Sequence, residues 1–138
     1  MGRMQRSFTG HFEILAPISR FVAESVQDAR LSQSDLYGLQ LAVDEAATNI
    51  IEYAYREEGQ GRIDLTVESG DDKVVITLHD TGEPFNPEEV PAYQSDIPLQ
   101  DMRERGAGLH LIRAIMDEVD FKFDERKGNT LQMVKVIA

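Results

Sequence analysis

The apolar residues of the chain follow two different periods, and the change between them predicts the elements. In the first part of the chain they recur every three or four positions, which is the spacing of a helix with one buried face. This pattern predicts a helix over residues 18–30, entered through Pro17, because proline is favoured in a first helical turn. It also predicts a second helix from an N-cap at Ser34 to about Tyr55, and a third helix over residues 109–117.

Elsewhere apolar and polar residues alternate, which is the pattern of a strand with one buried face and one face in water. The alternation is weak near the start, where Phe8 and Phe12 fall on one side, and regular in the later segments. Turn residues separate the later segments in pairs, so these segments predict hairpins. The predicted strands are residues 7–13, 62–68, 73–80, 119–124 and 130–137.

The predicted order is strand, helix, helix, hairpin, loop, helix, hairpin, within one domain that spans residues 1–138. Hairpins pair their strands antiparallel, and amphipathic helices bury one side against a sheet. We therefore expect an α+β fold, a two-layer sandwich whose mixed, mostly antiparallel sheet is covered on one face by helices. The irregular stretch 82–105 is rich in proline and long for a loop, which is typical of a functional lid.

Composition and charge exclude several classes of protein. With 138 residues, 41% hydrophobic and 28% charged, the chain is typical of one folded domain. A net charge of −11 disfavours binding to nucleic acid. It would attract a basic protein partner, or it serves only to keep the protein soluble. There is no apolar run of the roughly 20 residues that span a bilayer and no apolar start typical of a secretory signal. The lack of cysteine excludes disulfides and thiolate chemistry, so we expect a cytoplasmic protein that binds neither nucleic acid nor membrane.

Two polar groups interrupt the pattern and are candidates for chemistry. Glu45 and Asn49 lie one turn apart on the second helix, about a quarter turn from its apolar stripe, so they would border the core. A carboxylate there can take a proton from a hydroxyl, and an amide oxygen suits Mg²⁺ held together with phosphates. Asp80 continues the inward face of its strand, where a carboxylate needs donors such as an adenine amino group, and Gly82 lets a backbone pass close to a flat ligand. A solvated helix face and a strand-ending turn are the plainer interpretations.

Two further motifs contain glycine. Gly106 and Gly108 follow Arg105 and precede the third helix, where backbone N–H groups and the helix dipole favour an anion such as phosphate. Thr130 opens the last strand and is able to hydrogen-bond a phosphate or a base. Taken alone, these residues are more commonly explained by a flexible loop end and a plain hairpin turn.

The order and setting of the four motifs resemble the N, G1, G2 and G3 boxes of the GHKL ATPases, which share the Bergerat fold. The resemblance covers residues 8–137 and is greatest to the anti-sigma factor serine/threonine kinase family. The segments that carry it are Leu41-Ala-Val-Asp-Glu-Ala-Ala-Thr-Asn49, Asp80-Thr-Gly-Glu-Pro-Phe85 and Arg105-Gly-Ala-Gly-Leu109.

The resemblance implies a role for each matched residue. It makes Glu45 the general base, Asn49 the ligand of Mg²⁺, Asp80 the partner of the adenine amino group, and residues 91–105 the ATP lid. It implies ATP as the phosphoryl donor and Mg²⁺ as the cofactor. The other residues that it assigns to the nucleotide site are Gly82, Phe85, Arg105, Gly106, Gly108, Leu109 and Thr130.

The resemblance also implies partners. Such kinases phosphorylate a serine or threonine of an anti-sigma-factor antagonist, sequester a sigma factor, and commonly form homodimers through the N-terminal strand and first helix. Two alternatives stay open. One is an ATP-binding, partner-switching regulator without kinase activity, which Glu45 disfavours. The other is a protein that sequesters a partner without using ATP, which the glycines at 82, 106 and 108 disfavour.

Overall fold

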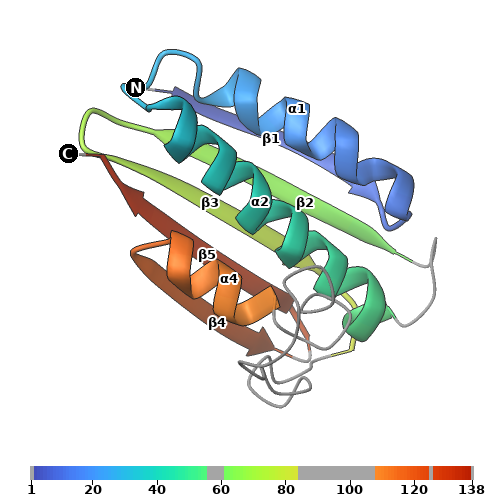
Figure 1. Cartoon of the computed structure of the whole chain (residues 1–138). Coiled ribbons are helices and arrows are strands. Elements are labelled where there is room, and N and C mark those ends of the chain that lie inside the picture. Colours follow the sequence, from blue (N-terminus) through green and yellow to red (C-terminus); the bar gives the residue numbers. More distant parts are fainter. Residues whose placement is uncertain (1, 56–60, 84–107, 125, 138) are drawn as a thin grey trace, which may run out of the picture.

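The protein is built from one antiparallel sheet with helices on one of its faces (Figure 1). The computed structural model describes residues 2–55, 61–83, 108–124 and 126–137. Within these residues the strands follow the order β1-β2-β3-β5-β4, and each neighbouring pair is antiparallel. The predicted two-layer α+β sandwich is therefore confirmed, with a sheet that is antiparallel throughout its described strands.

The strands of the two predicted hairpins lie close to their predicted positions, because their alternation is regular. The bounds are β1 Gly2–Thr9, β2 Arg62–Ser69, β3 Lys73–Asp80, β4 Glu118–Asp124 and β5 Gly128–Val136. The first strand was predicted too late, at residues 7–13. Its position is set by pairing with β2, from Gly2 opposite Ser69 to Thr9 opposite Arg62, and its exposed edge position weakens the alternation.

The end of β1 also corrects the predicted pairing of two phenylalanines. Phe8 is buried and packs edge-on against the Phe21 ring, with ring centroids 6.1 Å apart. Phe12 belongs instead to a short 3₁₀ turn, Phe12–Ile14, and is 40% exposed. The two rings therefore do not share one face of a strand.

The first two helices confirm the predicted elements and shift their ends. Helix α1 covers Leu15–Ser25, with Pro17 in its first turn as expected, but it ends five residues before the predicted residue 30. Helix α2 covers Gln33–Asn49. Its N-cap is Ser32 and not Ser34, since the Ser32 hydroxyl accepts the backbone N–H of Asp35 at 3.0 Å.

The helical path continues past Asn49 to the predicted end, but with a different hydrogen-bond pattern. Ile50–Tyr55 form a π-helical segment, and Ile50, Ile51, Ala54 and Tyr55 are all buried. Segments of this kind are rare and occur frequently next to functional sites. Helix α4 covers Gly108–Ile115, two residues shorter than predicted at its end. Asp117 lies outside the helix because it hydrogen-bonds to β5. Its backbone N–H donates to the carbonyl oxygen of Val134, and its carboxylate accepts the backbone N–H of Val136.

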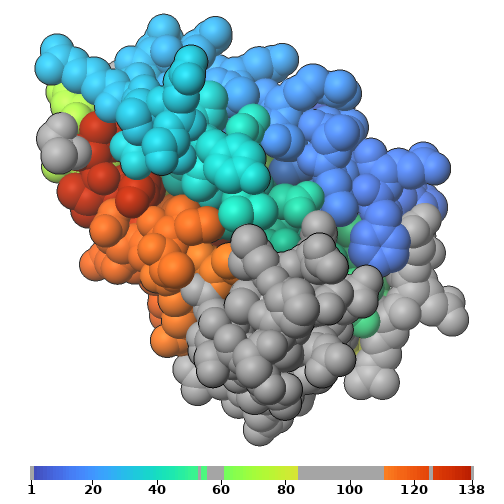
Figure 2. Space-filling model, in the orientation of Figure 1, coloured from blue at the N-terminus to red at the C-terminus, as the bar shows by residue number. Residues whose placement is uncertain are grey.

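The core lies between the helices and the inward face of the sheet. The inward side chains of β2, β3 and β5 alternate with outward ones, as predicted, and meet the apolar stripes of α1, α2 and α4. Figure 2 shows that the surfaces of these three helices adjoin one another across this side of the molecule. No helix in the described part of the chain is long and apolar enough to cross a membrane.

The ends of several elements meet at one end of the molecule. The C-terminal end of α2, the end of β3 and the starts of β5 and α4 all lie there (Figure 1). Strand register fixes part of this arrangement, since Asp80 at the end of β3 lies opposite Asn129 near the start of β5. Several of the elements that were predicted to carry site residues therefore meet at this end, although they come from distant parts of the sequence.

The N-cap of α2 gives a test of the helix start. Ser32→Ala removes an acceptor for an otherwise unpaired helical N–H and is expected to lower the free energy of unfolding by about 1 kcal/mol. Ser34→Ala is the matched control, because Ser34 lies inside the helix and is exposed. Urea denaturation of both variants measures the difference. A larger loss for Ser34→Ala would contradict the assigned cap.

Candidate functional site

Asp80 is a buried carboxylate at the end of β3. Val74, Ile76, Leu78 and Asp80 alternate with outward residues, and the Asp80 side chain is 3% exposed, so it continues the inward face as predicted. Its Oδ1 accepts two hydrogen bonds of 2.9 Å, from the backbone N–H of Gly82 and from Nδ2 of Asn129. No hydrogen bond to Oδ2 is found among the described residues. One oxygen is thus held by the protein, and the other is available to a donor.

Burial governs the acidity of this group. Loss of water around Asp80 raises the pKa of its carboxyl above the ordinary value of 3.8. The hydrogen bonds from Asn129 and Gly82, and the nearby His79, lower the pKa but do not cancel the effect of burial. The ionised form therefore gains from any further donor that reaches Asp80.

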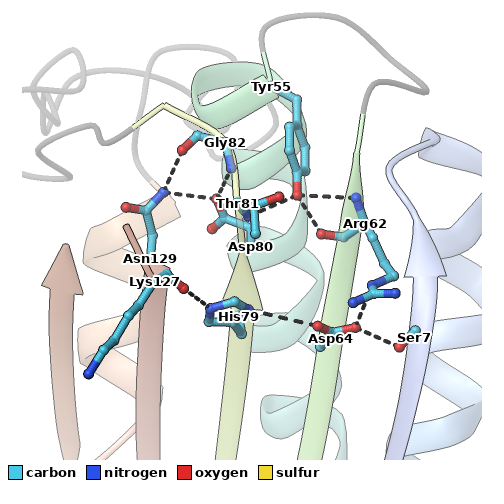
Figure 3. A network of polar contacts seen from close by, with 10 residues as sticks. All are labelled: Ser7, Tyr55, Arg62, Asp64, His79, Asp80, Thr81, Gly82, Lys127 and Asn129. Carbon is cyan, nitrogen blue, oxygen red and sulfur yellow. Dashed lines mark hydrogen bonds and ion pairs between the residues drawn. The ribbon is translucent and has the colours of Figure 1, made fainter. Parts of the chain in front are cut away.

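Asn129 is the partner of Asp80 and was missed as a functional residue. Its Nδ2 donates to Asp80 Oδ1 and, at 3.1 Å, to the carbonyl oxygen of Gly82 (Figure 3). Its Oδ1 is buried and has no hydrogen-bond partner among the described residues, which costs on the order of 1–3 kcal/mol if no ligand or water supplies a donor. One signal in the sequence was its parity, because Asn129 alternates in step with the apolar residues Leu131 and Met133.

Thr130, predicted to fix the nucleotide, lies next to Asn129 with the opposite parity. It contributes to the lining of the hollow beside Asp80. Its position opposite His79 in the register, however, places its side chain on the outer face of the sheet, away from the inward Asn129 and Leu131. The inward side chain at this point of β5 is that of Asn129.

A hollow opens between α2, α4 and the inward face of the sheet. The space between its lining residues totals about 350 Å³, and this value includes space open to solvent. Asp80 and Asn129 supply its polar groups from the sheet, together with Asn49 from α2. Its other walls are mainly apolar, as is usual for small-molecule sites. They are formed by Ala46, Ile50, Ile112, Phe121, Phe123 and Leu131, with Thr130.

Gly82 is required here for packing, which differs from the reason predicted. A Cβ at this position would lie 2.6 Å from the carbonyl oxygen of Ala54, at the end of the π-helical segment. The next residue, Glu83, donates its backbone N–H to the same oxygen at 2.7 Å. The glycine thus lets the chain after β3 pass beneath the helix end, and this close passage brings its N–H to Asp80.

Tyr55 fastens the helix end to two strands. Its hydroxyl donates to the carbonyl of Arg62 at 2.5 Å and accepts the backbone N–H groups of Arg62 at 3.1 Å and Thr81 at 3.2 Å (Figure 3). Arg62 starts β2 and Thr81 directly follows Asp80. One buried hydroxyl therefore fixes the turn that carries Asp80 and Gly82.

The outer face of the sheet carries a second polar network, on the opposite side from the hollow. Asp64 on β2 accepts the Ser7 hydroxyl at 2.5 Å and the Arg62 Nε at 3.0 Å, and lies 3.8 Å from His79 Nδ1. His79 Nε2 lies 2.6 Å from the carbonyl oxygen of Lys127, in the turn before β5. The network ties β1, β2 and β3 to this turn, so it supports the register that joins Asp80 to Asn129 (Figure 3).

The two residues predicted on α2 differ in their exposure. Asn49 is partly buried and lines the hollow, as expected for a residue at the edge of the core. Glu45, one turn earlier, is 3% exposed and so lies deeper than predicted. The described residues contain no group of three or more His, Cys, Asp or Glu side chains able to hold a metal ion. A single amide oxygen at the hollow still fits Mg²⁺, since this ion commonly takes one or two protein oxygens together with phosphates and waters.

Some of the remaining predicted residues lie outside the described part of the chain, and two lie at the start of α4. Phe85, Arg105, Gly106 and the predicted lid, residues 91–105, fall outside the described residues. Gly108 and Leu109 are the first two residues of α4, as the predicted helix start requires. The start of this helix lies at the same end of the molecule as the end of β3, which is Asp80, and the end of α2, which is Asn49 (Figure 1).

Solved structures share this fold. The crystal structure of the RsbU and RsbW domains of Rv1364c from Mycobacterium tuberculosis matches 99% of the chain with a TM-score of 0.69 at 15% identity, and the chain spans 33% of it. The catalytic domain of the histidine kinase ThkA matches with a TM-score of 0.56 at 16% identity, covering 99% of this chain and 98% of that domain. At these identities the likeness shows that the chain shares the fold of the RsbW domain and of histidine kinase catalytic domains.

Sequence comparison makes the assignment more specific. The model of the histidine kinase-like ATPase domain family matches residues 8–135. Serine-protein kinase RsbW of Oceanobacillus iheyensis is 34% identical over 111 residues, which are 78% of this chain and 69% of that protein. RsbW of Bacillus mycoides is 31% identical over 129 residues, 91% of this chain and 79% of that protein. The chain therefore belongs to the histidine kinase-like ATPase domain family, within its serine-protein kinases, which confirms the predicted family and enzyme class.

The contacts of Tyr55 give a test of how the site is held. Tyr55→Phe removes one donor and one acceptor from three backbone groups and is expected to cost about 1–3 kcal/mol of unfolding free energy. Tyr37→Phe serves as the control, since Tyr37 is 67% exposed. Chemical denaturation compares the two variants. Equal stability would show that the Tyr55 hydroxyl does not fasten this turn.

The raised pKa of Asp80 predicts a dependence of stability on pH. In the unfolded chain Asp80 has its ordinary pKa, so the folded state binds this proton more tightly. The folded state therefore becomes more stable as the pH falls from neutral through the raised pKa, and the gain is complete below about pH 3.8. Asp80→Asn keeps an Oδ1 acceptor for Gly82 and Asn129 without the charge. We expect this variant to be more stable than the wild type at neutral pH, with a difference that shrinks on acidification. Denaturation at several pH values tests this, and a difference that grows on acidification would contradict it.

Proposed function

We propose that this chain uses ATP to phosphorylate a serine or threonine of an anti-sigma-factor antagonist, and that it sequesters a sigma factor. The observation that carries the proposal is the buried Asp80, held through one oxygen by Asn129 and Gly82 beside an apolar hollow. The relatives named serine-protein kinase RsbW support the type of activity.

The base of the nucleotide occupies the hollow. Adenine presents an amino group, which is a donor, on an otherwise flat apolar ring, and Asp80 Oδ2 accepts from it. The apolar walls from α2, α4 and β4 hold the ring faces and exclude water, which strengthens this hydrogen bond. Recognition of the base thus follows from groups on rigid elements.

The phosphates extend toward the starts of α4 and of the glycine-containing segment before it. Backbone N–H groups at Gly108 and Leu109, with Gly106 and the Arg105 guanidinium, bind the phosphate oxygens. The Asn49 side-chain oxygen holds Mg²⁺ from the side of α2. When bound, Mg²⁺ neutralises phosphate charge and favours in-line transfer. Phe85 belongs to the same nucleotide site, and residues 91–105 are the ATP lid that the family resemblance implies.

Glu45 acts as the general base. It lies one helical turn from Asn49 and is 3% exposed, so it is largely removed from water. It accepts the proton of the protein substrate's hydroxyl while the γ-phosphoryl group moves to that oxygen; the bond from the γ-phosphorus to the β–γ bridging oxygen breaks and ADP leaves. Most of the rate enhancement comes from positioning and from stabilisation of charge.

The partners and setting follow from the same proposal. The kinase works in the cytoplasm as a homodimer through β1 and α1, and a net charge of −11 suits basic surfaces on its protein partners. It binds neither nucleic acid nor membrane directly.

Transfer of labelled phosphate to a purified antagonist domain tests the proposed reaction. Glu45→Gln removes the base with little change of shape and is expected to lower transfer at least about 100-fold. Its melting temperature should still rise with Mg-ATP as in the wild type, because binding stabilises the folded state.

Each result has a distinct meaning. Wild-type transfer by Glu45→Gln would overturn the role of Glu45. Nucleotide binding without transfer by the wild-type protein would favour a partner-switching regulator that lacks kinase activity. No change of melting temperature with millimolar Mg-ATP would overturn the use of ATP altogether.

A further inference from the structure

The Asn129 amide has one atom without a function in the fold. The side chain is 3% exposed and lines the same hollow as Asp80. Its Oδ1 is fully buried and has no hydrogen-bond partner among the described residues. Buried polar atoms in native proteins are almost always paired, so an orphan in the wall of a ligand site points to a donor on the ligand.

The orientation of the amide is fixed by its surroundings. Its nitrogen lies 2.9 Å from Asp80 Oδ1 and 3.1 Å from the carbonyl oxygen of Gly82, and both of these groups are acceptors. A flipped amide would place its oxygen against the two acceptors and lose both bonds. The free atom is therefore the oxygen, and Figure 3 shows it turned away from Asp80 and Gly82.

The ligand donor can be identified from the chemistry of the base. Adenine has one strong hydrogen-bonding donor group when it is attached to ribose, the 6-amino group with two hydrogens. Asp80 Oδ2 accepts one of them under the proposed function, on which this inference rests. We propose that Asn129 Oδ1 accepts the second amino hydrogen, so that Asn129 is a specificity-determining residue as well as the partner of Asp80.

The arrangement explains how the site would reject other purines. A 6-oxo purine presents a carbonyl oxygen to two acceptors, Asp80 Oδ2 and Asn129 Oδ1, and leaves both buried and unpaired. A purine without a 6-substituent also leaves both unpaired, but without repulsion. Sites built to bind an amino group discriminate strongly against analogues that lack it, because unpaired buried groups are costly.

Calorimetric titration with ATP, purine riboside triphosphate and inosine triphosphate tests the proposal. For each protein we compare the Kd of purine riboside triphosphate with that of ATP. The ratio of the first to the second is expected to be about tenfold smaller in Asn129→Ala than in the wild type, because the bond from the adenine amino group to Asn129 is lost. Gln132→Ala is the matched control, because this amide is exposed on the outer face of the same strand, and it should keep the wild-type ratio. An unchanged ratio in Asn129→Ala would overturn the proposal.

A measurement on the wild-type protein separates ligand contact from support of Asp80 and needs no variant to fold. The side-chain carbonyl carbon resonance of labelled Asn129 should shift with ATP and not with purine riboside triphosphate, which keeps the ribose and phosphates. Equal shifts with both would assign Oδ1 to another donor and overturn the inference. If the wild type bound no ATP, the proposed function would fail and the inference with it. ATP binding with neither effect would overturn the inference alone.

Discussion

The buried carboxylate of Asp80 is the constraint on which this end of the molecule depends. A carboxylate on the inward face of a sheet is costly unless donors meet it, and its donors come from Gly82 and Asn129. The Asn129 bond exists only in the observed register of β3 and β5, in which the two residues lie opposite each other. A slip of one residue would turn Asn129 to the outer face, so a correct sheet and a satisfied Asp80 require one another.

The same requirement shapes the helix above the sheet. The Asp80 donor at Gly82 is in place because the chain passes close beneath the carbonyl of Ala54, where a side chain would not fit. Tyr55, the next residue, then reaches the start of β2 and the turn after Asp80 with one hydroxyl. Ala54 and Tyr55 both belong to the π-helical segment. The departure from regular α-helix after Asn49 therefore lets the helix that carries Glu45 and Asn49 contact the turn that follows Asp80.

Local pattern was enough to predict the hairpin strands, the helices and the inward position of Asp80, since each depends on alternation or on a 3.6-residue period. The helix cap was misplaced because Ser32 and Ser34 differ little in sequence, while backbone geometry selects Ser32. Other features depend on contacts between distant segments. Gly82 is required because the carbonyl of Ala54 lies close to it. Asn129 reaches Asp80 because of the register between β3 and β5, and the length of β1 is set by its pairing with β2. The inward position of Asn129 follows from the face of β5, which a motif read by side-chain chemistry alone does not use.

Two polar residues of the hollow, Asp80 and Asn129, use only some of their atoms within the fold. Asp80 gives one oxygen to Gly82 and Asn129, and Asn129 gives both amide hydrogens to Asp80 and Gly82. These internal bonds fix the direction of the atoms that remain, so a ligand would find its acceptors already oriented and need not order them. Burial raises the pKa of Asp80, and a donor at Oδ2 favours the ionised form. The electrostatic cost of burying this carboxylate is therefore offset most fully by a ligand with an amino group at that point, which makes the cost itself a source of selectivity.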